Sequence, residues 1–268
     1  MSGQLSPGTA LITGASSGLG ATFAHHLAAL KYNLVLVARR EDRLRTLGGQ
    51  LSQRFGIRTE ILPADLSTDA GIIHVEEGIR ARTDLTLLVN NAGFGGGGAF
   101  YQIDTAKAAD MIHVHVVATA RLTRAVLPQM VERKRGAVIN LGSVAAFFVL
   151  PGSALYGSTK AWVVAFSRVL AQELRGTGVR LQALCPGFTH TEFHDSPEFE
   201  KLKDSSIPDF LWMSADEVID KSLRALARGK SVCIPGFKNK ILAAIPRVPF
   251  AGPIIRRIAR SHKQAAGR

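Results

Sequence analysis

Short apolar runs and longer segments with helical spacing alternate along the chain. The runs at 34–37 (Leu-Val-Leu-Val) and 138–141 (Val-Ile-Asn-Leu) lack the regular polar alternation of a half-exposed strand. Such runs are typical of strands buried on both faces of a parallel sheet. We therefore predict strands at residues 10–13, 33–38, 58–63, 85–90, 136–141, 180–185 and 231–234, with helices in the segments between them.

Length and composition fit one domain built from these elements. A chain of 268 residues with 46% apolar content can bury a substantial core, and no internal repeat or linker divides it. Alternating strands and helices predict an α/β fold, with a doubly wound parallel sheet of about seven strands in a single domain. In such a sheet, ligands bind at the carboxyl ends of the strands.

The first predicted strand ends in a glycine-rich turn, and residues 21–29 then have helical character. Glycines let the backbone turn sharply and approach a ligand, and a helix start presents free N–H groups to an anion. A glycine loop alone is often only a turn, but the strand–loop–helix context favours a Rossmann-type phosphate cradle. We expect cofactor contacts at Gly14, Ser16, Ser17, Gly18, Leu19 and Gly20.

A second segment carries candidate catalytic residues. Tyr156 and Lys160 are four residues apart, hence on one face of the predicted helix, and Ser143 follows the fifth strand. An ammonium beside a phenol favours the phenolate, so we expect the Tyr156 pKa to move from its ordinary value near ~10 toward neutrality. Ser143 supplies a hydroxyl that can hold a substrate oxygen. The three residues suit proton transfer to or from a carbonyl or alcohol.

In this order, the two motifs resemble those of the short-chain dehydrogenase/reductase family in its short, single-domain form, over residues 5–237. The resemblance implies that Ser143, Tyr156 and Lys160 are catalytic, and that Tyr156 and Lys160 also contact the cofactor. It implies an adenine contact at Asp65 and Leu66, and a nicotinamide carboxamide contact at Thr189 or Thr191. Further matches to the family's cofactor site are Asn90, Asn91, Ala92, Gly93, Pro186 and Gly187.

One position departs from the family pattern. The family usually carries asparagine where His115 stands, and that asparagine is thought to hold a water that links the lysine to solvent. A histidine also donates and accepts hydrogen bonds, so His115 can serve in such a proton relay. A charged imidazolium beside Lys160 would be unfavourable, however. The alternative is that His115 is a packed core histidine.

The end of the second strand indicates which cofactor is used. An NAD-dependent enzyme usually places an acidic residue here to bind the ribose hydroxyls, whereas this chain has Ala38 followed by Arg39 and Arg40. Both guanidinium groups can pair with a 2′-phosphate, which predicts NADP(H). The alternative for Arg40 is a solvated charge at a helix start.

The substrate is less well specified. Residues 188–213 match the family's variable lid and are rich in aromatic side chains. These aromatics are expected either to cover an apolar substrate, with a second apolar segment as the opposite wall, or to pack on one another. The lid aromatics are Phe188, Phe193, Phe199, Phe210 and Trp212, and the opposite wall is Phe147, Phe148, Val149 and Leu150.

Charge is concentrated at the C-terminus. Residues Lys221 to Arg268 contain twelve Lys and Arg and no Asp or Glu, which accounts for the whole formal charge of +12. We divide the chain into a dinucleotide-binding and catalytic domain (1–237) and a basic C-terminal extension (238–268). The extension is expected to lie on an anionic membrane, to dock an acidic carrier protein, or to pack over the substrate pocket or an oligomer contact. Nucleic acid is disfavoured, because no stacking aromatics are interleaved with the charges.

Cysteine usage and the N-terminus point to the cytoplasm. Cys185 and Cys233 both fall in predicted strands, where buried thiols are more common than disulfides, and no metal is expected. The first residues lack a secretory signal, and no apolar run approaches the length of a membrane span. We expect a homodimer or homotetramer.

The sequence therefore predicts an NADP(H)-dependent oxidoreductase that transfers a hydride between nicotinamide and a small-molecule carbonyl or secondary alcohol. Tyr156 is the predicted general acid or base. A narrower alternative is a 3-oxoacyl-carrier-protein reductase. An alternative of another class is a non-catalytic nucleotide-sensing protein on the same fold, since a fold does not by itself imply chemistry.

Overall fold

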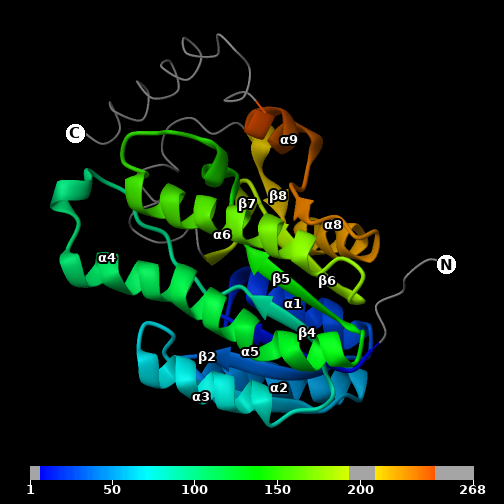
Figure 1. Cartoon of the computed structure of the whole chain (residues 1–268). Helices are drawn as coiled ribbons and strands as arrows, with labels where there is room; N and C mark the ends of the chain where they lie inside the picture. The colour runs from blue at the N-terminus through cyan, green and yellow to red at the C-terminus, as the bar shows by residue number, and fades with distance from the viewer. Residues whose placement is uncertain (1–6, 193–208, 245–268) are drawn as a thin grey trace.

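A central sheet of seven parallel strands organises the computed structural model, which describes residues 7–192 and 209–244 (Figure 1). The spatial order is β3-β2-β1-β4-β5-β6-β9. Every predicted strand is present, and each end lies within one residue of its prediction. The strands are β1 (Thr9–Thr13), β2 (Asn33–Ala38), β3 (Thr59–Pro63), β4 (Leu85–Asn90), β5 (Gly136–Leu141), β6 (Val179–Leu184) and β9 (Val232–Cys233).

Helices cover both faces of this sheet (Figure 1). Adjacent strand residues point to opposite faces, so Ala10 and Ile12 pack into one apolar cluster and Leu11 into the other. The first cluster contains residues of α1 (Gly18–Ala29), α2 (Glu41–Phe55) and α8 (Ala215–Ala227). The second contains residues of α3 (Asp69–Arg80) and α5 (Thr119–Glu132), and residues of α6 (Ala154–Glu173) pack against it. The predicted doubly wound, single-domain α/β fold is confirmed.

The chain reverses its direction across the sheet between β1 and β4. It runs outward from β1 to β3 and then returns to place β4 on the other side of β1. Open α/β sheets usually bind their ligands at such a reversal point, beside the loops that follow the two strands, here β1 and β4. The Thr13 hydroxyl joins the two loops, because it accepts hydrogen bonds from the backbone N–H groups of Asn91 and Ala92, both at 3.0 Å.

A second, two-stranded sheet was not predicted. Strand β7 (Thr189–His190) pairs in parallel with β8 (Met213–Ser214), and the Met213 amide also donates to the Phe188 carbonyl at 3.0 Å. The predicted lid therefore leaves the domain and returns to it at neighbouring points. Residues 193–208, which form most of that lid, lie outside the described residues.

The predicted boundary at residue 237/238 falls in the first turn of α9 (Phe237–Ala244). Asn239 and Ala243 of this helix are buried, so the described start of the basic extension packs on the domain. Residues 245–268 lie outside the described part of the chain. Among the described residues, no helix combines the length and apolar character needed to cross a membrane.

The remaining described elements are short connections. Helix α4 (Thr105–Ile112) continues into a π-helical turn, η2 (His113–Ala118), which leads directly into α5. The other turns are 3-10 helices: η1 (Phe100–Gln102), η3 (Val144–Phe147) and η5 (Asp209–Leu211).

Candidate active site

Ser143, Tyr156 and Lys160 come together at the carboxyl edge of the sheet. Ser143 follows β5 and caps η3, where its Oγ accepts the Ala145 amide at 3.1 Å. Tyr156 and Lys160 are one turn apart on α6, with the Lys160 ammonium 5.7 Å from the centre of the Tyr156 ring. A hydrogen bond joins the Ser143 and Tyr156 side chains. The structure thus assembles the group that the spacing of these residues predicted.

Lys160 is a buried cation. Its residue is 4% exposed, and its ammonium donates to the Leu141 carbonyl at 3.0 Å. Burial lowers the pKa of Lys160 to about 8. Because Leu141 is the last residue of β5, this hydrogen bond fixes the ammonium at the end of the strand that leads to Ser143.

The Tyr156 phenol differs from its sequence-based expectation. Burial raises the pKa of Tyr156 to about 12, although the residue keeps a partly exposed edge, and the Ser143 hydrogen bond acts in the opposite direction. The expected lowering by Lys160 does not prevail, because loss of solvation of the phenolate is the larger effect. The phenol is therefore protonated at neutral pH, as a proton donor to a carbonyl oxygen must be.

His115 lies beside these residues and is 1% exposed. Its Nε2 accepts the Phe94 backbone N–H at 3.2 Å, and its Nδ1 lies 2.9 Å from the Thr159 hydroxyl. The imidazole meets the Tyr156 ring edge-on at 5.8 Å between ring centres. Burial and the nearby Lys160 charge hold the pKa of His115 well below its ordinary value. The imidazole is neutral at physiological pH.

The glycine loop packs tightly on its own backbone and on the loop after β4. Gly14 has a positive φ of +65°, and a Cβ there would lie 2.9 Å from the Ala92 Cα. A Cβ on Gly20 would collide with the Gly14 carbonyl. Only glycine fits at either position. The Asn91 amide supports the turn by donating to the carbonyls of Thr13 at 2.9 Å and Gly14 at 3.2 Å.

Arg40 lies across the glycine loop. Its guanidinium donates to the Ser16 hydroxyl at 3.1 Å and to the Ser17 hydroxyl at 2.8 Å. Arg39 instead approaches Asp65, with 3.9 Å between guanidinium nitrogen and carboxylate oxygen. Both arginines are thus at the end of the sheet where the sequence placed the cofactor ribose. Arg40 is held there by the loop itself, so it is more than a solvated charge at a helix start.

Sequence reasoning missed Glu192 as a partner of Arg40, and Arg43 as a second arginine that shares this partner. Arg43 and Arg40 both face Glu192, at 3.0 Å and 3.7 Å respectively. The i, i+3 spacing of Arg40 and Arg43 on one helix face is a signal that was available, whereas Glu192 lies far away in sequence. Thr191, one of the two predicted carboxamide contacts, lies beside Gly18, 3.5 Å from where a Cβ on that glycine would be. The start of the predicted lid is therefore adjacent to the glycine loop.

The side chains of three other predicted cofactor residues make contacts inside the protein. The Asn90 side chain turns into the core, where it donates to Thr123 at 3.0 Å and to Asn140 at 2.8 Å. Leu66 is buried in an apolar cluster. The buried Thr189 hydroxyl donates to the Gly187 carbonyl at 3.0 Å.

Asn239 of α9 is a further residue that the sequence analysis did not single out. A Cβ on Gly187 would collide with its side chain, so α9 rests directly on the predicted Pro186-Gly187 cofactor segment. The Asn239 amide donates to the Pro235 carbonyl at 2.9 Å, and its side-chain oxygen is buried without a hydrogen-bond partner among the described protein atoms.

The proposed substrate walls are described only in part. Trp212 stacks on His190 at 4.8 Å and contacts Phe188 at 5.5 Å between ring centres, so these lid aromatics pack on one another. Val149 on the opposite wall is 90% exposed. Phe193, Phe199 and the Phe210 side chain lie outside the described part of the structure.

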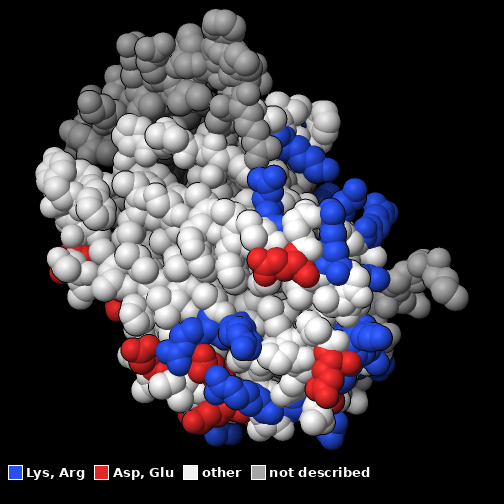
Figure 2. Space-filling model, viewed as in Figure 1, with Lys and Arg blue, Asp and Glu red and all other residues white. Residues whose placement is uncertain are grey.

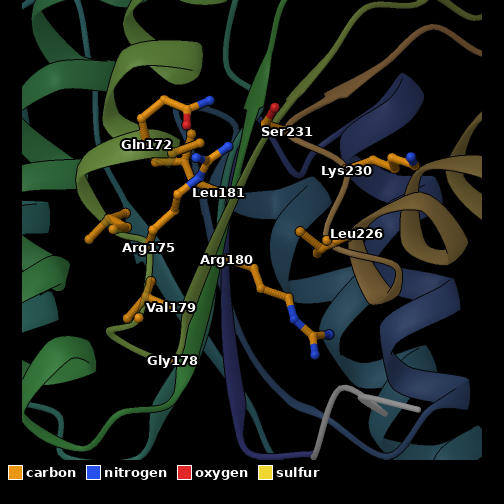
Figure 3. A pocket seen from close by; sticks show the side chains of 13 residues that line it. Gln172, Arg175, Gly178, Val179, Arg180, Leu181, Leu226, Lys230 and Ser231 are labelled. Atoms are coloured by element: carbon orange, nitrogen blue, oxygen red, sulfur yellow. The ribbon is translucent and has the colours of Figure 1, made fainter. Parts of the chain in front are cut away.

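A hollow of about 340 Å³ lies at the other end of the sheet (Figure 3). Its walls include Val179 and Leu181 at the start of β6 and Ser231 just before β9. Because Ser143 follows the carboxyl end of β5, this hollow is remote from the catalytic group. It is lined by Arg175, Arg180 and Lys230, but their charged ends lie apart in Figure 3 and do not converge on one point.

Comparison with known proteins identifies the family. The family model described as short chain dehydrogenase matches residues 8–200. The chain belongs to this family. Sulfoacetaldehyde reductase 2 of Chromohalobacter salexigens is 40% identical over 186 residues, which cover 68% of this chain and 73% of that protein. A very-long-chain 3-oxoacyl-CoA reductase-like protein of Arabidopsis thaliana is 36% identical over 187 residues, 68% of this chain and 60% of that protein's length.

A solved structure extends the similarity over nearly the whole chain. The short-chain dehydrogenase from Sphingobium yanoikuyae in complex with NADPH superposes with a TM-score of 0.80 and 35% sequence identity. The match covers 98% of this chain and 96% of that one. The chain is therefore a family oxidoreductase with the Rossmann-type fold that its strand and helix pattern predicted.

Proposed function

We propose that this chain is an NADP(H)-dependent oxidoreductase that interconverts an apolar ketone or aldehyde and the corresponding alcohol. The observation that carries the proposal is the convergence of Ser143, Tyr156 and Lys160 at the carboxyl edge of the sheet, with Lys160 close to Gly93 in the loop after β4. The names of two relatives, a sulfoacetaldehyde reductase and a very-long-chain 3-oxoacyl-CoA reductase-like protein, agree with carbonyl reduction.

The residues at the carboxyl ends of β1, β2 and β4 fit a dinucleotide. Gly14 and Gly20 allow the loop to turn tightly where the pyrophosphate of such a cofactor is expected, and the start of α1 presents N–H groups there. Arg40 and Arg39 suit a 2′-phosphate, since guanidinium groups pair with phosphate through two hydrogen bonds. The NADPH bound by the Sphingobium yanoikuyae enzyme is consistent with this choice of cofactor. When bound, NADPH supplies the hydride.

The chain's own residues bind the carbonyl oxygen of the substrate and donate a proton to it. Ser143 holds the carbonyl oxygen through its hydroxyl, and the protonated Tyr156 phenol donates its proton to that oxygen as the alcohol forms. Lys160 binds the ribose hydroxyls and its positive charge stabilises the phenolate that remains. In the direction of oxidation, the same phenolate accepts the proton from the alcohol.

The direct test is a screen of ketones, aldehydes and secondary alcohols with NADPH, NADP⁺ and NADH, followed at the nicotinamide absorbance. We expect reduction of at least one bulky apolar ketone or aldehyde with NADPH. Calorimetry with NADPH alone provides the control for cofactor binding. NADPH binding without turnover of any compound would favour the nucleotide-sensing alternative over the enzyme.

A 3-oxoacyl thioester reductase is the second candidate. The name of the Arabidopsis thaliana relative and the basic C-terminal extension favour it. The test compares a 3-oxoacyl-CoA with the same acyl group on an acidic carrier protein. If the basic extension docks the carrier protein, the carrier-bound substrate should have the lower KM. If it does not, the carrier protein should give no lower KM than CoA. Assembly as a homodimer or homotetramer and a cytoplasmic location stay predictions from the sequence.

A further inference from the structure

His115 has both ring nitrogens engaged. A backbone N–H can only donate, so the Phe94 amide at 3.2 Å requires an unprotonated Nε2. The neutral imidazole then carries its proton on Nδ1, which donates to the Thr159 hydroxyl at 2.9 Å. Thr159 in turn donates to the Tyr156 carbonyl at 2.9 Å. The hydrogen bonds therefore run in one direction from the imidazole to the backbone of the catalytic tyrosine.

The hydrogen bonds of His115 connect two segments of the active site, the loop after β4 and helix α6. Phe94 belongs to the loop after β4, next to Gly93, and Thr159 belongs to α6 between Tyr156 and Lys160. A Cβ on Gly93 would lie 2.8 Å from His115 Nε2 and 3.5 Å from the Lys160 ammonium, so the loop lies close to both side chains. His115 itself is carried by the π-helical turn η2, a feature often found at functional sites.

This geometry does not suit a proton relay. A relay must pass a proton in at one nitrogen and out at the other, but the Phe94 N–H at Nε2 cannot accept one. A packed core histidine does not account for the geometry either, because both bonds lead to segments of the active site.

We propose that His115 is a positioning residue, which fixes the Gly93–Phe94 loop at a set distance from Tyr156 by binding Phe94 with one nitrogen and Thr159 with the other. The catalytic consequence rests on the proposed oxidoreductase function. The loop is expected to lie against the nicotinamide, so its distance from Tyr156 sets the alignment of the reacting atoms. Small misplacements of this kind reduce turnover more than cofactor affinity.

We call the hydrogen bonds of His115 to Phe94 and to Thr159 its two arms. Two amide substitutions test them separately. The side-chain amide of asparagine lies as far from Cβ as Nδ1 does, so His115→Asn retains the donor to Thr159 and loses the acceptor for Phe94. The amide of glutamine reaches the place of Nε2, so His115→Gln retains the acceptor for Phe94 and loses the donor to Thr159. Thr159→Val removes the second arm from the other side, and Thr159→Ser is its matched control with the hydroxyl retained.

We expect each single-arm loss to lower kcat about three- to tenfold, as the loss of one hydrogen bond permits, with a smaller change in KM for NADPH. His115→Leu, which removes both arms, should lower kcat further, and Thr159→Ser should remain near wild type. Because His115→Gln and Thr159→Val remove the same arm, the double variant should be no slower than either alone. His115→Asn combined with Thr159→Val should instead show multiplied losses.

Hydrogen exchange of the Phe94 amide, measured by NMR, tests the geometry without any turnover. The amide should exchange slowly in wild type and His115→Gln, and at least tenfold faster in His115→Asn and His115→Leu. Equal kcat for wild type and His115→Leu, or equal Phe94 exchange in all variants, would overturn the proposal. If the exchange pattern appears in a protein that reduces no carbonyl, the proposed function fails and the positioning of the loop stands.

Discussion

At the scale of single residues, Tyr156 carries the proposed chemistry most directly. Its phenol is held protonated by burial, with a pKa of about 12, and hydrogen-bonds with Ser143. Tyr156→Phe keeps the ring and removes the transferable proton. Turnover should fall by a factor of ~10² or more, while NADPH affinity from calorimetry stays within about threefold. Wild-type turnover in this variant would exclude Tyr156 as the proton donor.

Burial of the Lys160 ammonium should make the free energy of unfolding depend on pH. Its pKa is about 8 in the folded protein against an ordinary value of 10.5, so burial disfavours its charged form. Below pH 8 both folded and unfolded states hold the proton, and the cost of burying the charge is fully present. Between pH 8 and 10.5 the unfolded state binds more protons, so the wild-type free energy of unfolding rises relative to that of a variant without the ammonium.

Lys160→Met removes that ammonium. Its free energy of unfolding should exceed that of the wild type at pH 7, and the difference should shrink by on the order of 2 kcal/mol by pH 10. Urea unfolding of the two proteins at both pH values measures this. A difference that does not change with pH would mean that Lys160 keeps an ordinary pKa in the folded state.

The residue scale also shows how far the sequence could predict the site. Tyr156 and Lys160 were predictable because helical spacing alone puts them on one face. Asn90 lies in an equally suggestive motif, yet its side chain turns into the core to bind Thr123 and Asn140. Which way a side chain points at a strand end depends on long-range partners. The same reason explains why both hydrogen bonds of His115 escaped prediction.

At the scale of elements, the end of β2 and the start of α2 form the proposed 2′-phosphate site. Arg40 is held over the glycine loop by Ser16 and Ser17, and Arg39 lies at the same strand end. Arg39→Asp combined with Arg40→Ala should therefore shift the ratio of kcat/KM values toward NADH by tenfold or more, since a charge-assisted phosphate pair contributes about 1.5–3 kcal/mol. Arg45→Ala is the matched control, because Arg45 pairs with Glu41 along the same helix. A wild-type protein that already prefers NADH would contradict this assignment.

Glu192 connects this site to the start of the lid. Its carboxylate faces Arg40 at 3.7 Å and Arg43 at 3.0 Å, so it competes with a phosphate for the same guanidinium groups. All three side chains are about half exposed, which limits the pair energy to about 1 kcal/mol or less. Glu192→Gln should tighten NADPH binding by up to about fivefold and change NADH binding less. Calorimetry with both cofactors tests this, and weaker NADPH binding would show that Glu192 organises the arginines.

Elements differed in how well the sequence predicted them. Most of the six longer strands of the main sheet were predictable because their apolar residues form an unbroken run, as in β2, or alternate with polar ones, as in β6. Strands β7 and β8 are two residues each, too short for any periodicity, and only their pairing at Thr189 and Met213 defines them. Helix α9 was likewise assigned to a basic tail, because its charged residues obscure the buried Asn239 and Ala243.

At the scale of the whole molecule, positive charge gathers over α8 and α9, the last helices that the structure describes. Figure 2 shows Lys and Arg side chains over the part of the surface that α8 and α9 form in Figure 1. Exposed basic residues there are Lys221, Arg224, Arg228, Lys230, Lys238 and Lys240. Phe237 and Ile241, one turn apart on α9, are 75% and 50% exposed among them. Exposed apolar residues with basic neighbours are typical of segments that lie on anionic membranes.

The extension beyond Ala244 contains six Lys and Arg and no acidic residue, and it lies outside the described residues. If the extension binds lipid, the full chain should sediment with vesicles that contain anionic lipid at low salt and be released from them at high salt. The reason is that each Lys or Arg near the membrane contributes about 1 kcal/mol of electrostatic attraction, which salt screens. Truncation after Ala244 retains α9 and its buried Asn239, and should weaken sedimentation at least tenfold without changing NADPH affinity. Vesicles of neutral lipid are the control. If the extension instead packs over the substrate pocket, full-length and truncated protein should both ignore the vesicles, and truncation should change the KM for the carbonyl substrate or the melting temperature.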